Sequence, residues 1–271
     1  MKRFCRLGIF VGLILVVLAS LSCLSPFSAL TSTVLGGITS ATKKTSFTNS
    51  EAVAAMKEAL NEGIKSASAT LSKKDGYFGN AALKILMPEE AKPILKVLNK
   101  IPGGQGLVDD VVLRINRSAE ESAKDVTDIF AQAIKEMTVT DGIEIVTGSN
   151  TAATEYLKSK TYNKLVSLYK PKLSTALNKP LVMNVSAEKA WTNLTSSYNK
   201  VGSAPNKLAK ATGKAEPFPA VKVDLATYST EKALDGLFIK IGEVEEDIRK
   251  NPRNYTSDLI NKVFGAIKGT K

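Results

Sequence analysis

The sequence contains no histidine, and its only cysteines are Cys5 and Cys23. Histidine is the commonest general base, and histidine and cysteine are the usual zinc ligands. Their scarcity excludes serine–histidine and cysteine–histidine nucleophile pairs. A metal could then be held only by carboxylates, yet the chain has no calcium loop of the D-x-[DN]-x-[DN]-G type. We therefore expect no metal, no cofactor and no enzymatic activity.

Carboxylates are the one remaining source of catalytic chemistry. They cluster at Asp109, Asp110, Glu120, Glu121 and residues 243–247, and we expect the last cluster to be an exposed surface. Two carboxylates that face each other across a cleft could cleave sugar chains. A carboxylate-dependent cell-wall hydrolase is therefore the alternative function. A deep cleft with two convergent acids would favour it, whereas a broad lysine face without a cleft would favour a binding protein.

The N-terminus has the pattern of an export signal. Lys2, Arg3 and Arg6 precede an almost unbroken apolar run over residues 7–21, which leads to Cys23. Positive residues before an apolar run hold that end in the cytoplasm and are typical of signal peptides. We predict that residues 1–23 are a signal peptide. The remainder would be exported to the cell envelope, facing the periplasm from the outer membrane or another membrane.

Three fates of this segment fit the sequence. Ser22 suits the cleavage site of a bacterial lipoprotein, although Ser20 stands where leucine is usual. We favour this fate, in which a lipid on Cys23 anchors the protein in a membrane. Ser20 and Ser22 also fit ordinary secretory cleavage, which leaves Cys23 unmodified. Residues 7–24 just reach the length of a spanning helix, so an uncleaved anchor is the third fate.

The rest of the chain divides into a tether and a helical domain. Residues 24–49 are rich in serine, threonine and glycine, which predicts a flexible tether, with a short helix over residues 29–38 as the alternative. From residue 50 to residue 271, apolar residues recur at steps of three and four, the period of amphipathic helices. Strand-like alternation is confined to residues 220–223. We predict an all-α fold, a single multi-helix globular domain.

Apolar stripes and capping residues predict the individual helices. The clearest stripe predicts one long helix over residues 107–137. Asn49 or Ser50 would begin the first helix, Ser186 would begin the helix that starts at residue 187, and Gly148 would end another. Asn251-Pro252 would end the helix whose stripe runs to residue 248. The remaining predictions are helices over residues 51–71, 140–147, 187–198 and 234–248, and a last helix capped by Thr256.

Positive charge is concentrated in the middle of the chain. The net charge is +11, and residues 158–214 contain eleven lysines against one acid, Glu188. Such a surface could attract anionic lipid head groups or acidic cell-wall polymers. Lysine offers a hydrated point charge rather than a bidentate fork, so specific recognition of nucleic acid is not expected. The candidate binding residues are Lys158, Lys160, Lys164, Lys170, Lys172, Lys207 and Lys210.

Aromatic residues are interleaved with these lysines, namely Tyr162, Tyr169, Trp191 and Tyr198. They could settle at a membrane interface or stack on the rings of a ligand. The competing interpretation is that the lysines cover helix faces and keep the protein in solution, while Trp191 and Tyr198 belong to the core.

Six short motifs extend over nearly the whole domain. They are KDGYFGN at residues 74–80, INRSAE at 115–120, AIKEMT at 133–138, AATEY at 152–156, KALDGLF at 232–238 and TSDLINKVFG at 256–265. Their sequence and order resemble a bacterial family called domain of unknown function 4197. The resemblance implies one exported helical domain and implies no activity.

Polar residues in these motifs are not required by packing alone, notably Asp75, Asn116, Arg117 and Asp235. A buried Arg117 would need a carboxylate partner. We predict a structural ion pair between Arg117 and Asp235 that joins the two halves of the domain, with a ligand site as the alternative.

Together these observations predict a non-catalytic binding or structural module of the cell envelope. It would be monomeric or weakly associating, and it would be attached to a membrane through lipid on Cys23. The lysine-rich region would dock on an anionic lipid surface or on a cell-wall polymer.

Overall fold

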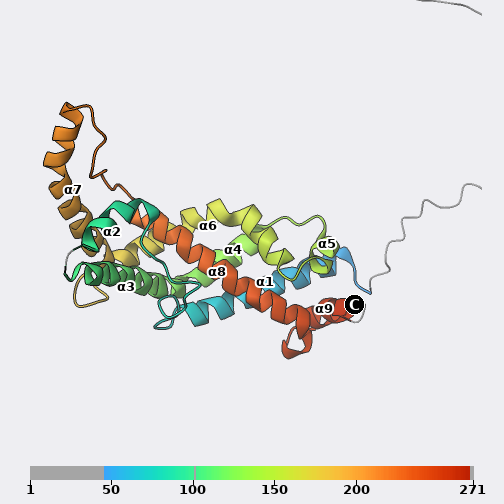
Figure 1. Cartoon of the computed structure of the whole chain (residues 1–271). Helices are drawn as coiled ribbons and strands as arrows, with labels where there is room; N and C mark the ends of the chain where they lie inside the picture. The colour runs from blue at the N-terminus through green and yellow to red at the C-terminus, as the bar shows by residue number, and fades with distance from the viewer. Residues whose placement is uncertain (1–45, 101, 269–271) are drawn as a thin grey trace, which may run out of the picture. The chain divides into compact units, whose positions relative to one another are not determined.

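The computed structural model describes residues 46–100 and 102–268. The predicted signal peptide, the lipid attachment at Cys23 and residues 24–45 of the predicted tether lie outside the described residues. The described chain is helical and its residues form no β-strand, so the all-α class is confirmed (Figure 1). The helices are α1 (Asn49–Leu71), α2 (Lys92–Leu98), α3 (Gly104–Ser122), α4 (Val126–Glu136), α5 (Gly142–Thr147), α6 (Ala152–Asn178), α7 (Ala187–Ala211), α8 (Leu225–Lys250) and α9 (Asp258–Lys268).

The core forms around α1 and α8. Helix α1 packs on α8, α4, α5 and α9, and α6 packs on α8, α3 and α4. Gly63 of α1 lets α8 approach closely, because a Cβ atom there would lie 2.9 Å from the Cγ2 atom of Ile241. Thr45–Lys271 form one compact unit with this core. A chain that begins at residue 24 therefore retains every helix that builds the core.

Local capping explains where several helices begin and end. Helix α1 begins with a capping box, in which Thr48 and Glu51 each accept a hydrogen bond from the other's backbone N–H. The predicted cap at Asn49 or Ser50 is corrected to Thr48. The Asn49 side chain instead donates to the carbonyl of Thr140 and accepts from the N–H of Ile143 in the first turn of α5. Ser186 caps α7 as predicted. Ser257, rather than Thr256, caps α9, because its hydroxyl accepts a hydrogen bond from the backbone N–H of Ile260 in the first turn.

The long helix predicted over residues 107–137 is divided in two. A 3₁₀ turn, Ala123–Asp125, separates α3 from α4. The hydroxyl of Ser68 in α1 donates a hydrogen bond of 2.8 Å to the carbonyl of Ala123 at this break. Helix α3 packs on α6 and α7, whereas α4 packs on α1 and α6.

Candidate functional site

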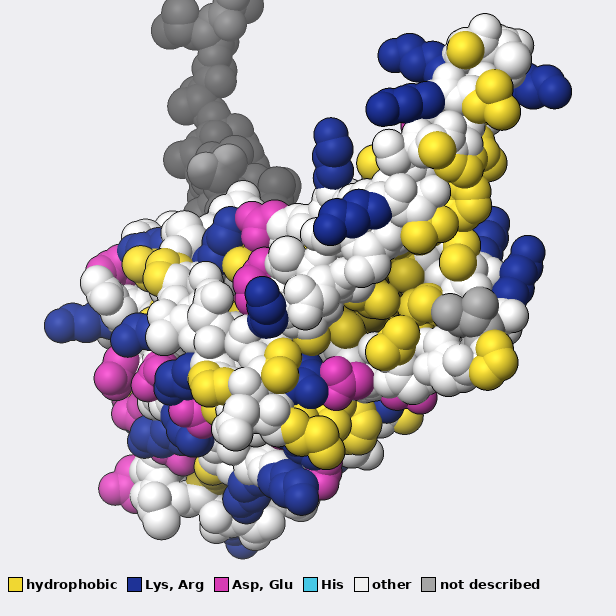
Figure 2. Space-filling view, turned by 90° about the vertical axis from the view of Figure 1, so that its left-hand side faces the viewer, with side chains coloured by type: hydrophobic (Ala, Val, Ile, Leu, Met, Phe, Trp, Pro, Cys, Tyr) yellow, Lys and Arg dark blue, Asp and Glu magenta, His cyan; other side chains and the backbone are white. Residues whose placement is uncertain are grey.

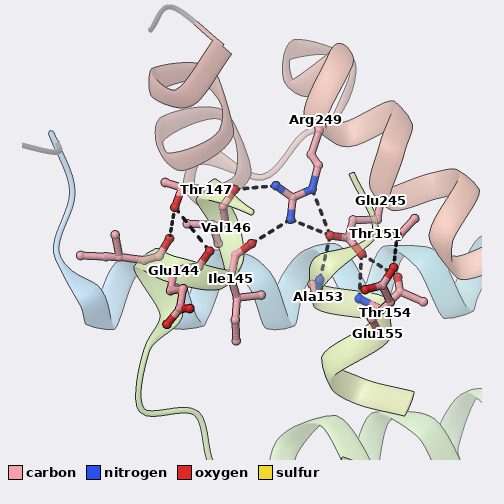
Figure 3. Close-up of polar contacts among 11 residues, drawn as sticks. Glu144, Ile145, Val146, Thr147, Thr151, Ala153, Thr154, Glu155, Glu245 and Arg249 are labelled. Carbon is pink, nitrogen blue, oxygen red and sulfur yellow. Dashed lines mark hydrogen bonds and ion pairs between the residues drawn. The ribbon is translucent and has the colours of Figure 1, made fainter. Parts of the chain in front are cut away.

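One buried ion pair joins three helices, as Figure 3 shows. Glu245 of α8 is only 1% exposed and accepts hydrogen bonds from the backbone N–H groups of Ala153 and Thr154, at 3.0 and 2.7 Å. Arg249, one turn later, pairs with Glu245 at 2.7 Å and donates to the carbonyls that end α5. Glu245 therefore caps the start of α6, and Arg249 caps the end of α5.

A second network surrounds Arg117, and it corrects the predicted partner. Arg117 pairs with Asp75 at 2.7 Å and with Glu120 at 2.6 Å, whereas Asp235 pairs with Lys158 at 2.8 Å. The loop between α1 and α2 folds back onto α3 and brings Asp75 to Arg117. No local pattern in the sequence indicates this contact. The hydrogen bond from Arg117 keeps the pKa of Asp75 below its ordinary value.

Glu120 and Asn116 complete this network. Glu120 accepts hydrogen bonds from the backbone N–H groups of Tyr77 and Phe78, at 3.2 and 3.0 Å. The Asn116 side chain both donates to and accepts from the backbone of Ile85. The polar residues of the KDGYFGN and INRSAE motifs thus fix the long loop between α1 and α2, which makes them structural.

The acidic clusters also find their partners within the protein. The pairs are Asp109 with Gln105, Asp110 with Arg114, Glu121 with Lys179, Glu243 with Lys240, Glu246 with Lys250 and Asp247 with Tyr255. The expectation that residues 243–247 are all exposed is wrong for Glu245, which is the buried cap described above. Across the described part of the chain, acidic and cysteine side chains form no group of three that could hold a metal ion.

The structure divides the candidate lysines into two sets. On α6, Lys158 pairs with Asp235 and Lys164 pairs with Glu136. Lys170 pairs with Asp224 at 2.7 Å, and this contact, with hydrogen bonds from Thr227, lowers the pKa of Asp224 to about 2. Three lysine charges on α6 are therefore neutralised by acids from elsewhere in the fold. These acids are Glu136 in α4, Asp235 in α8 and Asp224 at the N-cap of α8. The other two candidates on this helix are Lys160, which lies over the ring of Tyr156, and the exposed Lys172.

The second set lies on a projecting arm. We define the arm as the second half of α7, residues 199–211, together with the segment that returns to α8, residues 212–222. Figure 1 shows α7 rising away from the other helices, with this segment running back beside it. The arm carries five lysines against one acid, Glu216. Its lysines, all exposed and without an ion pair to any described residue, are Lys200, Lys207, Lys210, Lys214 and Lys222.

Two asparagines hold the arm together. The side chain of Asn206 donates to the carbonyl of Phe218 and accepts from its N–H at 3.0 Å. Asn199, seven residues earlier, makes the same pair of bonds with Val221. Gly202 between them gives Phe218 room, because a Cβ atom there would lie 2.5 Å from the Cβ of Phe218. The strand-like residues 220–223 are thus extended chain clamped to a helix, not a strand.

An apolar stripe runs along the exposed side of the arm. Val201 and Leu208 are 63% and 68% exposed, and Leu194 precedes them at the same seven-residue spacing. This spacing keeps side chains on one face of a helix. Lys200 and Lys207, also seven residues apart, stand on the adjoining face. The arm therefore presents apolar side chains bordered by positive charge.

The aromatic residues do not join this surface. Tyr169, Trp191 and Tyr198 are buried in the core, and Tyr169 shares a hydrogen bond of 2.7 Å with Ser122. Tyr162 packs against Phe238 with ring centroids 6.1 Å apart. The interpretation that these rings settle at an interface is therefore wrong for Tyr169, Trp191 and Tyr198, and the assignment of Trp191 and Tyr198 to the core is confirmed.

A groove opens where the arm leaves the body. It has a volume of about 530 Å³ and lies between α2, α3 and the first half of α7. Its walls are mainly apolar, with Ile94 and Val97 on α2, Val111 on α3 and Leu194 on α7. Figure 2 shows hydrophobic side chains gathered in the hollow beneath the projecting arm, with lysines around it.

None of the helices within residues 46–100 and 102–268 combines the length and apolar character that crossing a membrane requires.

Comparison with known proteins adds a family and no activity. The searches of curated proteins and of solved structures found no match. The family described as "Protein of unknown function (DUF4197)" matches residues 46–265, which is most of the chain. The match covers helices α1 to α8, α9 as far as Gly265, and the buried networks around Glu245 and Arg117. The chain belongs to this family, as the resemblance of its six motifs predicted.

Proposed function

We propose that the protein is a non-catalytic module of the cell envelope that docks on an anionic membrane surface through its arm. The observation that carries this proposal is the position of the arm's lysines. Five of them stand exposed and without ion pairs to described residues, beside the exposed Val201 and Leu208. Helices that lie on membrane surfaces combine an apolar face with flanking lysines in this way.

The charge on the arm is large enough to matter. Each lysine close to an anionic membrane contributes about 1 kcal/mol, so a net charge of four is worth about 4 kcal/mol, or about a thousandfold in binding. The contribution of Val201 and Leu208 adds to this when they leave water. Because exposed charges are screened by salt, binding would weaken at high ionic strength.

The arm and the first turn of α1 lie at different ends of the body (Figure 1). The first turn of α1 packs against α5 at Gly142, and α9 lies at this same end (Figure 1). The arm rises from the opposite end of the body, beside α2 and α3. Helix α1 has 23 residues and is therefore about 35 Å long. The arm therefore projects clear of the end of the body that holds α5 and α9.

The test is co-sedimentation of residues 24–271 with vesicles. Vesicles that contain phosphatidylglycerol would be compared with pure phosphatidylcholine at low and high salt. The variant Lys200→Glu/Lys207→Glu/Lys210→Glu reverses three charges on the arm. Lys73→Glu/Lys135→Glu/Arg253→Glu makes the same change in net charge at exposed positions of the body.

We expect salt-sensitive pelleting of the wild type and of the body variant, and its loss in the arm variant. Equal pelleting of all three proteins would contradict the proposal. Equal loss in both variants would show that net charge, rather than the arm, drives binding. Pelleting with peptidoglycan but not with vesicles would identify a cell-wall polymer as the docking surface.

A further inference from the structure

The groove at the base of the arm is built to bury hydrocarbon. Leu107 at its edge is 53% exposed and Val201 is 63% exposed, although both line a concave surface. A volume of about 530 Å³ is within the range of small-molecule sites, which are mostly apolar with a few polar groups. Apolar side chains that stay exposed in a hollow of this size favour an apolar occupant.

The charged side chains in the groove wall neutralise each other. Arg114 is buried and pairs with Asp110 at 2.8 Å. The same guanidinium donates to the carbonyls of Val182 and Val185, in the turn that leads into α7. Its Nε and Nη1 groups are occupied and Asp110 balances its charge, so this pair adds no net charge to the groove wall. The inner part of an occupant must therefore be uncharged.

The edge of the groove is polar and positive. Asn193 and Ser197 line it from α7, are exposed and make no side-chain hydrogen bond to any described residue. Lys189 stands one turn before Asn193, and Lys200 stands one turn after Ser197. Both lysines are exposed and pair with no acid in the described part of the chain. An anionic group at this edge would meet two free charges and two free hydrogen-bonding side chains.

We infer that the groove binds a single-chain anionic amphiphile, a long-chain carboxylate. Its hydrocarbon chain would lie between α2, α3 and α7, and its head group would lie between Lys189 and Lys200. Charge complementarity with the lysine edge selects this occupant over an uncharged lipid, and the Arg114–Asp110 pair leaves the interior without a net charge that would hold the head group. The inference goes beyond the proposed docking function, since it requires no membrane.

The test is a calorimetric titration of residues 24–271 with palmitate, kept below its aggregation concentration. Trp191, the only tryptophan, is next to the groove residue Ala190 and gives a second signal. Ser197→Phe fills the groove from an exposed position, so the fold should be kept. Lys189→Glu/Lys200→Glu removes the positive edge, and Lys73→Glu/Arg253→Glu is its matched control.

We expect saturable binding of one palmitate. Binding should weaken at least about tenfold in Ser197→Phe and in the edge variant, because one loses the space and the other reverses two charges beside the head group. The control should match the wild type. Absence of saturable binding, or unchanged affinity in Ser197→Phe, would overturn the inference. Equal affinity for hexadecanol would overturn the assignment of the head group.

These results can be separated from those on docking. Ser197→Phe keeps every lysine, so it should still pellet with anionic vesicles. Lys207→Glu/Lys210→Glu should weaken pelleting but leave palmitate affinity unchanged, because these lysines lie beyond the groove. Palmitate affinity that followed Lys207 and Lys210 instead of Ser197 would contradict a site in the groove.

Discussion

Removing the Glu245 carboxylate should be among the most damaging single changes to the fold. Glu245→Ala deletes the acceptor of the Ala153 and Thr154 N–H groups and of the Thr154 hydroxyl. It also leaves Arg249, whose side chain is 9% exposed, without its carboxylate. The start of α6, the end of α5 and the last turns of α8 would all lose a common contact.

The expected cost follows from burial. Breaking a buried ion pair by removing one partner costs about 3–5 kcal/mol, because the remaining charge stays buried and uncompensated. Total stabilities of domains are about 5–15 kcal/mol, so this one change would remove a large share. Glu245→Gln should restore little of the unfolding free energy that Glu245→Ala loses. Each carboxylate oxygen accepts from N–H donors, and the amide group of glutamine would face one set of them with its own hydrogens.

The assay is urea unfolding followed by circular dichroism, with the midpoint and slope fitted for each variant. Glu246→Ala is the matched control, since Glu246 forms an exposed pair with Lys250, and such pairs contribute about 1 kcal/mol or less. We expect a large fall in the unfolding free energy for Glu245→Ala and almost none for Glu246→Ala. A loss below about 1 kcal/mol for Glu245→Ala with an unchanged slope would refute the reasoning.

Three further changes test other contacts. Asn206→Ala should leave global stability nearly unchanged but speed amide exchange at Phe218, because its clamp on the arm is lost; unchanged protection would argue against the clamp. Arg117→Met should lower the unfolding free energy by about 3 kcal/mol in urea titrations, since it strands a buried carboxylate; a change below about 1 kcal/mol would count against this role. The pKa of Asp224, held at about 2 by Lys170, lies below its unfolded value, so the pair stabilises the fold above about pH 4 and is lost as pH falls further. The difference in Tm between the wild type and Asp224→Asn should therefore shrink from about pH 6 to about pH 3, and a constant difference would contradict the ion pair.

Local signals in the sequence were enough to predict much of the fold. Ser186 before α7, Gly148 after α5 and the Asn251-Pro252 break after α8 all act within one helical turn, so short-range chemistry reveals them. The break between α3 and α4 was missed because the apolar period continues through it. The carbonyl of Ala123 at this break accepts a hydrogen bond from Ser68, which is 55 residues away in the sequence and gives no local signal.

Helix α6 was the largest element that the sequence analysis did not predict. Its buried residues follow steps of four through Ala153, Leu157, Thr161, Leu165 and Tyr169. This stripe is present in the sequence, but threonine and tyrosine lower its apolar character, and lysines occupy many of the positions between its members. The recurrence of these residues at steps of four is the signal in the sequence that predicts this helix.

The candidate surface could be located only in part from the sequence. A count of lysines over residues 158–214 cannot show that Asp235, Glu136 and Asp224 come from other helices to neutralise those on α6. It also cannot show that α7 continues to Ala211 and carries its lysines away from the body. The free charge is therefore concentrated in a shorter stretch than the sequence indicated.

A fluorescent label on the arm tests the central claim most directly. Residues 24–271 contain no cysteine, so an environment-sensitive dye can be placed at Leu208→Cys on the arm or at Arg253→Cys on the body. On addition of vesicles that contain phosphatidylglycerol, we predict a blue shift at position 208, reversed by salt, and none at position 253. No shift at position 208, or equal shifts at both positions, would contradict docking through the arm.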